Sequence, residues 1–331
     1  MFAHSLRGSP KRRLAFTLLA GSLLGCGKPA PPGLPAPGVP VPPATGVPEK
    51  RTLAQAREGF STRTRDVPKG KAPPRPPAGV FQLVTYDAPV GELSAYLTPD
   101  PKDGRKRPAI VWITGGDCNS IDEGCWTDGG PANDQSAGAY RKAGVVMMFP
   151  SLRGGNDNPG RKEGFLGEVD DVIAAADFLA KQPHVDPARI YLGGHSTGGT
   201  VALLVAECTD KFRAVFSFGP VDEVAGYGPE YCPFDTSDAT EVRLRSPGRD
   251  LHGVKVPTVV IEGATGNADS LRAMAKNSTN PNLTFVEVPG ADHFGVLAPV
   301  NKLLAKKVAA DTGPPGAPTV TAAEVIAAVR K

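Results

Sequence analysis

A serine flanked by glycines stands between a short apolar run and a second apolar run of helical length. The motif Gly194-His-Ser-Thr-Gly-Gly199 directly follows residues 190–193 and precedes the segment 200–208. In such a turn from strand to helix the serine takes a strained backbone conformation, and glycines leave room for the adjacent strand and helix. The turn exposes the hydroxyl and aims the N–H of Thr197 at the place where an oxyanion develops. We therefore predict that Ser196 is a nucleophile and that Thr197 contributes to an oxyanion hole.

A serine hydroxyl needs a base at neutral pH, and two histidines follow the motif. His293 comes shortly after a predicted strand at 283–288, whereas His252 lies in a polar loop before a strand. Hydrolases with this turn carry their catalytic residues in the order serine, acid, histidine. This order favours His293 as the base. His195, inside the turn, is expected to pack or to form hydrogen bonds rather than to take part in catalysis.

The acid that orients the histidine has two candidates. Asp269 lies in the loop after the predicted strand 258–262, and Glu262 ends that strand. A carboxylate in the loop can turn toward His293, so we favour Asp269 and keep Glu262 as the alternative. Asp269 could instead cap the helix predicted over 270–276, because Asp is a favoured N-cap residue.

The second oxyanion donor is expected in the loop after the predicted strand 109–114. The chain continues there as Gly115-Gly116-Asp117, and glycines allow the backbone to approach a substrate closely. We predict the donor N–H near Gly116, with Asp117 as a second possibility. Two glycines after a strand are also compatible with an ordinary turn.

Short apolar runs alternate with helical patterns from Val80 onward. A helix predicted over 169–181 has acidic residues at its N-terminal end, where the helix dipole favours them. This alternation predicts an α/β fold with a mostly parallel sheet and helices on both faces. The predicted strands are 81–86, 92–97, 109–114, 145–149, 190–193, 214–218, 258–262 and 283–288.

The first 25 residues have the pattern of an export signal. A basic stretch is followed by the apolar run 14–25, which ends at Cys26. This run is shorter than the roughly 20 residues that a membrane span needs. Residues 23–26 resemble a bacterial lipobox, in which the cysteine carries the lipid. We therefore expect an exported lipoprotein, anchored to the cell envelope through Cys26; an ordinary signal peptide with an incidental cysteine is the alternative.

Residues 26–79 are rich in proline, glycine and charged side chains and have almost no apolar periodicity. Such a segment buries too little surface to offset its ordering entropy. We predict a signal peptide over 1–25, a disordered linker over 26–79 and a catalytic domain over 80–331.

Four further cysteines follow the linker. Because exported proteins meet an oxidising environment, we predict the local disulfides Cys118–Cys125 and Cys208–Cys232, with four free thiols as the alternative. Their spacing is not that of a zinc site, and the chain shows no dinucleotide fingerprint or phosphate loop, so neither metal nor cofactor is expected. The net charge of +3, part of it at the extreme N-terminus, does not indicate a nucleic-acid partner.

Several blocks of the chain carry a family resemblance. They are 149–155, 184–190, 194–199 and 290–293. Together they resemble the catalytic domain of the prolyl oligopeptidase family, within the α/β-hydrolase superfamily, over most of residues 80–310. The resemblance implies the α/β-hydrolase fold, acyl transfer to water without a metal, and a triad of Ser196, Asp269 and His293.

Two substrate classes stay open at this point. Peptidases of this family usually carry an N-terminal β-propeller, which the roughly fifty proline-rich residues before residue 80 cannot form. Relatives without a propeller include esterases, so we expect a small peptide or a carboxylic ester as substrate. The alternative is a surface lipoprotein that only binds a ligand or partner in the same pocket. The presence of all three triad residue types in order favours a hydrolase.

Overall fold

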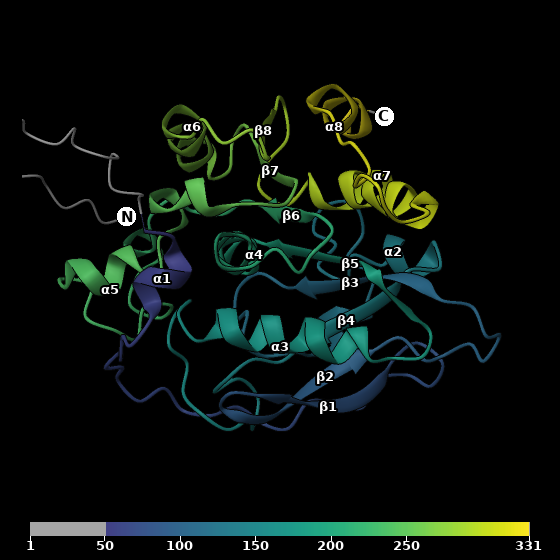
Figure 1. Ribbon diagram of the computed structural model, residues 1–331, viewed down its shortest axis with the longest axis horizontal. Coiled ribbons are helices and arrows are strands. Elements are labelled where there is room, and N and C mark those ends of the chain that lie inside the picture. The colour runs from purple at the N-terminus through teal and green to yellow at the C-terminus, as the bar shows by residue number, and fades with distance from the viewer. Residues whose placement is uncertain (1–50, 331) are drawn as a thin grey trace, which may run out of the picture. The chain divides into compact units, whose positions relative to one another are not determined.

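The computed structural model describes residues 51–330, which form an eight-stranded sheet in the order β1-β2-β4-β3-β5-β6-β7-β8 (Figure 1). The pairs β1/β2 and β2/β4 are antiparallel, and every pair from β4 to β8 is parallel. This confirms the predicted α/β fold with its mostly parallel sheet. The strands are β1 (Gln82–Ala88), β2 (Gly91–Leu97), β3 (Arg107–Ile113), β4 (Val146–Pro150), β5 (Val185–His195), β6 (Val215–Phe218), β7 (Thr258–Gly263) and β8 (Leu283–Val288).

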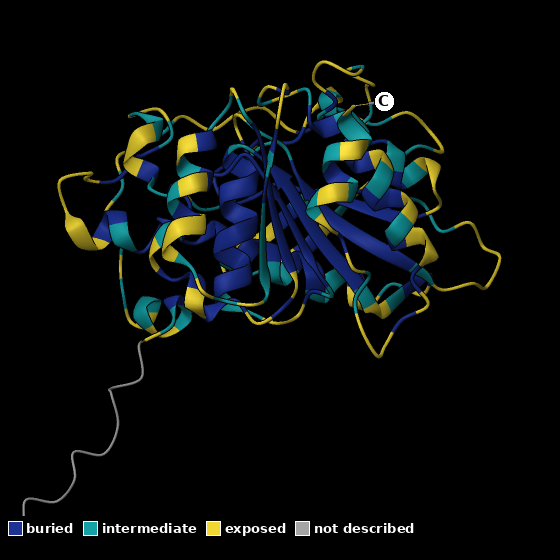
Figure 2. Ribbon diagram, turned by 90° about the horizontal axis from the view of Figure 1, so that it is seen from above, coloured by how far each residue is buried: buried dark blue, intermediate teal, exposed yellow. Residues whose placement is uncertain are grey.

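Helices cover both faces of the sheet (Figure 2). One face carries α3, α4 and α6, and the other carries α2, α7 and α8. Almost every residue of α4, the helix that follows Ser196, is buried. The helices are α1 (Leu53–Arg57), α2 (Ala139–Lys142), α3 (Glu168–Ala180), α4 (Thr197–Cys208), α5 (Ala239–Arg243), α6 (Ala268–Asn277), α7 (Leu297–Ala310) and α8 (Ala322–Val329).

Strand β3 shows why the sheet is buried on both sides. Successive side chains of a strand point to opposite faces, and those of β3 are apolar on each face. Ile110 and Trp112 pack under α2 and α7, whereas Ala109, Val111 and Ile113 pack under α3 and α4. Burying each large side chain of this kind contributes about 1.5 to 3 kcal/mol, so the centre of the sheet is a rigid support for the loops at its edge.

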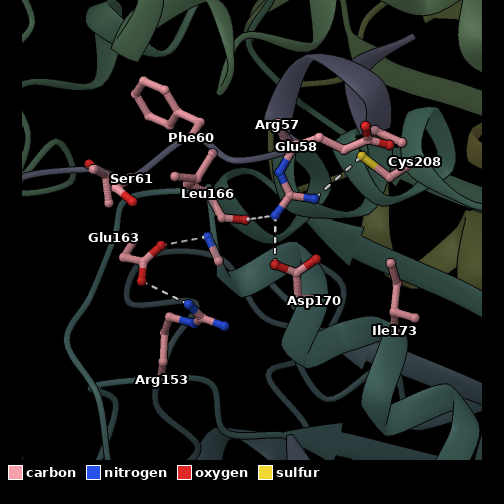
Figure 3. Close-up of a pocket in the computed structure, with 13 residues that line it drawn as sticks. Arg57, Glu58, Phe60, Ser61, Arg153, Glu163, Leu166, Asp170, Ile173 and Cys208 are labelled. Carbon is pink, nitrogen blue, oxygen red and sulfur yellow. Dashed lines mark hydrogen bonds and ion pairs between the residues drawn. The ribbon is translucent and has the colours of Figure 1, made fainter. Parts of the chain in front are cut away.

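The segment 51–79 packs on the domain, so the predicted disordered linker over 26–79 is wrong for this part. A capping box between Thr52 and Gln55 starts α1, and Leu53 is buried. The guanidinium of Arg57 donates to the carboxylate of Asp170 at 2.8 Å, as Figure 3 shows. The predicted signal peptide 1–25, Cys26 and the rest of the linker lie outside the described residues.

Residues 58–76, which we call the strap, contain no helix or strand and begin with a turn at 58–59. A proline-rich segment cannot satisfy its own backbone, and the domain supplies the partners instead. The N–H of Arg65 donates to the carbonyl oxygen of Pro233 at 2.7 Å, and the hydroxyl of Tyr96 donates to that of Pro74, also at 2.7 Å. Composition indicated that the strap has no core of its own; its order comes from these contacts.

All four described cysteines are free thiols, so both predicted disulfides are wrong. Cys118 packs in the core under α3 and α4, whereas Cys125 packs in the core on the opposite face of the sheet. The Sγ atom of Cys208 lies 3.7 Å from the guanidinium of Arg57 (Figure 3), and that of Cys232 donates to a backbone carbonyl. Closeness in sequence therefore joins neither pair, because each thiol packs among other partners.

Within residues 51–330, no helix combines the length and the apolar character that crossing a bilayer requires.

Candidate active site

Ser196 occupies a strained turn between β5 and α4. Its φ is 56° and its ψ is −117°, a region that residues other than glycine rarely adopt. The N–H of Ser196 donates to the carbonyl oxygen of Phe218 at 2.7 Å, which ties the turn to the end of β6. A side chain at Gly198 would collide with the carbonyl oxygen of Ile113. The structure therefore has the predicted strand, turn and helix, with the serine at the sharpest point.

His293 faces a carboxylate. Its Nδ1 atom lies 2.8 Å from Oε2 of Glu262, whose side chain is completely buried at the end of β7. Backbone N–H groups of Gly263 and Asn267 donate to the two oxygens of Glu262 at 2.6 and 2.8 Å and fix its orientation. A carboxylate only accepts hydrogen bonds, so the proton of the neutral imidazole resides on Nδ1 and Nε2 remains an acceptor. This is the tautomer that a general base needs.

Asp269 is not the partner of His293, so that prediction is wrong. Its side chain is 99% exposed and forms an ion pair with Arg272 at 2.9 Å. It does not cap α6 either, because the N-cap residue is Asn267 and no side chain caps that helix. After β7 the chain turns away from His293 toward α6, which carries Asp269 into solvent, whereas Glu262 stays at the strand end.

The side chains of Glu262 and His293 have room to meet because two neighbouring positions are glycines. A Cβ atom at Gly266 would lie 2.5 Å from Oε1 of Glu262, and one at Gly219 would lie 2.7 Å from Nδ1 of His293. Gly219 also has a positive φ of 59°. The glycine four residues after Glu262 is the signal in the sequence that could have favoured the glutamate over the aspartate.

The two predicted oxyanion residues lie side by side. Thr197 begins α4, and its hydroxyl donates to the carbonyl oxygen of Gly116 at 2.9 Å. Gly116 has a φ of 75°, which glycine adopts without strain. The N–H of Gly115 is already used, because it donates to Oε1 of Gln135 at 3.0 Å. The loop after β3 and the start of α4 therefore meet next to Ser196.

Tyr227 is a residue that sequence reasoning missed. It ends the short 3₁₀ helix Val224–Tyr227, in the long excursion after β6, and its hydroxyl hydrogen-bonds with the side chain of Thr200 at 2.8 Å. Its ring stacks on Phe165 with 5.4 Å between the centroids. Burial raises the pKa of Tyr227, so its hydroxyl stays protonated beside Thr200.

A cavity of about 250 Å³ opens beside Gly116. Val67 of the strap and Phe165 contribute apolar walls, and the charged pair Lys162 and Asp117, 2.6 Å apart, stands at the same cavity. The strap is therefore part of the surroundings of the loop at Gly116. His252, the rejected base, lies elsewhere, with Nε2 3.2 Å from the carbonyl oxygen of Arg51.

No group of three or more histidine, cysteine or acidic side chains in the described range is arranged to hold a metal ion.

Comparison with known proteins places this geometry in context. The model of the family described as the prolyl oligopeptidase family matches residues 133–303. The dual-function macrocyclase-peptidase POPB of Galerina marginata is 35% identical over 66 residues, which are 18% of this chain and 9% of that protein. The match thus spans about a tenth of the curated relative.

Two solved structures have similar folds. A puromycin-hydrolyzing peptidase of Mycobacterium tuberculosis superposes with a TM-score of 0.55 at 20% identity, over 69% of this chain and 39% of the peptidase. An esterase of Pyrobaculum calidifontis superposes with a TM-score of 0.53 at 18% identity, over 70% of this chain and 85% of the esterase. These likenesses show the α/β-hydrolase fold.

Proposed function

Because this chain belongs to the prolyl oligopeptidase family, we propose that it is a serine hydrolase that forms an acyl-enzyme at Ser196. The observation that carries the proposal is the 2.8 Å contact between Nδ1 of His293 and the buried carboxylate of Glu262, at the end of the sheet where Ser196 stands. A serine on a strained turn, a histidine whose Nδ1 faces a carboxylate, and that buried carboxylate are the three parts of a nucleophilic triad.

In the first half of the reaction, Nε2 of His293 takes the proton of the Ser196 hydroxyl while Oγ bonds to the carbonyl carbon of the substrate. The resulting imidazolium is stabilised by Glu262 and then donates its proton to the leaving amine or alcohol as the bond to the carbonyl carbon breaks. In the second half, water attacks the acyl group by the same route, and Ser196 recovers its proton.

The oxyanion of each tetrahedral intermediate is proposed to lie between the N-terminus of α4 and the loop at Gly116. Thr197 supplies a backbone N–H and the positive end of the helix dipole. The hydrogen bond from the Thr197 hydroxyl to Gly116 holds the two donor segments together. Because these groups are already in place, little reorganisation is needed when charge develops.

We propose a short peptide or a carboxylic ester as substrate. The peptidases among the relatives support the first class, and the esterase, which the superposition covers over 85% of its length, supports the second. Initial rates on p-nitrophenyl acetate and on short peptide anilides separate the two classes.

A fluorophosphonate probe tests the nucleophile directly. We expect it to label the wild-type chain at Ser196 and to leave the Ser196→Ala variant unlabelled, because only the activated hydroxyl attacks phosphorus. Circular dichroism of the variant checks that its fold is kept. A wild-type chain that is neither labelled nor active on any ester or peptide favours the alternative of a binding-only lipoprotein.

We also propose that the protein is exported and anchored to the cell envelope by lipid at Cys26. The support is the apolar run 14–25 and the lipobox-like residues that end it. Cys26→Ser should move the protein from the membrane pellet to the supernatant. A variant that still sediments with membranes after a high-salt wash contradicts this proposal.

A further inference from the structure

His195, the residue before the nucleophile, is completely buried, yet both of its ring nitrogens form hydrogen bonds. Nε2 lies 3.0 Å from the backbone carbonyl oxygen of His293, and Nδ1 lies 2.8 Å from Nε2 of Gln135. The rings of His195 and His293 are close, with 4.4 Å between their centroids. His195 therefore connects the loop that carries His293, the proposed base, with the side chain of Gln135 from a different loop.

The donors and acceptors in this network leave only one consistent arrangement. A backbone carbonyl accepts only, so Nε2 of His195 carries the proton and Nδ1 is an acceptor. Nδ1 must then receive a hydrogen from the amide nitrogen of Gln135, which leaves Oε1 of Gln135 as an acceptor. That oxygen accepts the N–H of Gly115 at 3.0 Å, as this arrangement requires.

The neutral state of His195 is consistent with its surroundings. Burial, and then the neighbouring His293, lower the pKa of His195 to about 3. A protonated Nδ1 would also point at the amide hydrogens of Gln135, which are donors themselves.

Gln135 is anchored to the sheet and to its own loop. Its backbone carbonyl accepts the indole N–H of Trp112 at 3.2 Å, and its amide nitrogen also donates to Oδ1 of Asn133 at 2.7 Å. Trp112 is completely buried in β3. The network thus connects a rigid strand with three loops that carry the proposed nucleophile, base and oxyanion donors.

We propose that Gln135 and His195 are positioning residues, which set the place of His293 and of the oxyanion loop relative to Ser196. This inference rests on the proposed function. The backbone of His293 is held through its carbonyl oxygen by His195, and its ring is held through Nδ1 by Glu262. With both held, Nε2 of His293 has little freedom to move, and a displacement of about 1 Å at such a site costs about 100-fold in rate.

Two variants of His195 separate its two hydrogen bonds. The amide nitrogen of a glutamine can take the place of Nε2, so His195→Gln keeps the bond to His293. The oxygen of an asparagine can take the place of Nδ1, so His195→Asn keeps the bond to Gln135 and loses that to His293. We expect kcat on an activated ester to fall roughly 10- to 100-fold in His195→Asn and Gln135→Met, with KM changed less than about twofold. His195→Gln should keep more activity than either.

Tyr140→Phe is the matched control. Tyr140 is buried under the same face of the sheet, its ring lies 6.0 Å from that of Trp112, and its hydroxyl has no hydrogen-bond partner among the described residues. Removing that hydroxyl should leave kcat unchanged. Thermal unfolding of all variants, followed by circular dichroism, shows that activity is compared between folded proteins.

A readout that does not need activity is the tautomer of His195. ¹⁵N NMR of the wild-type chain at pH 7 should show the proton on Nε2 of His195. A proton on Nδ1, or an imidazolium, overturns the network, and so does a His195→Asn variant that is folded and has wild-type kcat. A wild-type chain that is inactive and unlabelled by fluorophosphonate instead overturns the proposed function, whatever the tautomer.

Discussion

The carboxylate of Glu262 accepts the Nδ1 proton of His293 at 2.8 Å, across 31 positions of sequence. The two residues meet because β7 and β8 are parallel neighbours, so the loops that follow them leave the same edge of the sheet. Residue 262 pairs with Glu287 in the register of these strands, and His293 follows that strand after a short turn. The histidine is thereby brought over the end of β7 rather than over the start of α6.

The acid of the proposed triad can be tested by two substitutions, each of which removes one carboxylate. Glu262→Gln should lower kcat by about 10³ to 10⁴, because the imidazole loses the partner that selects its tautomer and stabilises its charge. Asp269→Asn, the control, should keep wild-type activity, since that side chain is exposed and pairs with Arg272 rather than with His293. Steady-state kinetics on an activated ester measure both, and the opposite ranking would restore Asp269 as the acid.

The four described cysteines should be free and unreactive in the folded protein. Burial raises the pKa of Cys125 and of Cys208 to about 12, so hardly any thiolate is present at neutral pH. We expect iodoacetamide to modify these cysteines only after denaturation without a reductant. Peptide mapping by mass spectrometry checks each site, and a peptide pair joined through Cys118 and Cys125 would contradict the structure.

Glu207 should make the protein less stable as the pH rises. Both of its carboxylate oxygens are buried without a partner among the described residues, and burial together with the nearby Asp250 raises the pKa of Glu207 well above its ordinary value of 4.5. The folded state therefore holds a proton that the unfolded state has already lost, and stability falls as the pH rises above the unfolded pKa.

The substitution Glu207→Gln removes this dependence, because the amide has no proton to lose. We expect its Tm to exceed that of the wild type by roughly 2 to 4 °C at pH 8, with the difference shrinking toward pH 4. Glu58→Gln, at an exposed position, is the control and should change Tm at neither pH. Calorimetry across this pH range makes the comparison; a constant difference between Glu207→Gln and wild type would mean that Glu207 is ionised in the folded protein.

The buried pair of Arg153 and Asp171 should be essential for folding stability. The backbone N–H and Nε of Arg153 donate to one oxygen of Asp171 at 2.9 and 3.0 Å, and Nη2 donates to the other at 2.8 Å. Arg153→Met leaves the completely buried carboxylate without its countercharge, which should cost about 3 to 5 kcal/mol in the free energy of unfolding.

The double variant Arg153→Met/Asp171→Leu removes the completely buried carboxylate together with its countercharge and leaves the partly exposed Glu163 without its ion-pair partner. It should be more stable than Arg153→Met alone. Urea denaturation of the two single variants and the double variant measures their coupling. Additive losses would show that the ion pair makes no contribution of its own.

The strand, turn and helix around Ser196 were predictable because their signals are local. These signals are the glycines at 194, 198 and 199 and the apolar runs on either side of them. All of them lie in the strand before the serine, in the turn itself or in the helix after it, and the strained φ of 56° follows from that arrangement. The choice of His293 over His252 followed from chain order, which the sequence shows directly. The alternation of apolar runs likewise predicted the parallel sheet.

The strap and the cysteines show the limit of composition as a guide. Proline-rich residues 58–76 have no apolar core of their own, but the domain supplies partners such as the carbonyl oxygen of Pro233, which is more than 150 positions away. Cys118 and Cys125 are near neighbours in sequence, yet they pack on opposite faces of the sheet. Neither outcome could be found without the positions of distant segments.

The sequence by itself predicted a serine on a tight turn in an α/β domain and a later histidine as its base, in that order. Only the tertiary structure decided that Glu262, and not Asp269, faces His293, and that Gln135 and His195 connect the loops around Ser196. The physical reason is the range of the interactions: backbone propensities and sterics act over a few residues, whereas a hydrogen bond forms between any two groups that packing brings within about 3 Å.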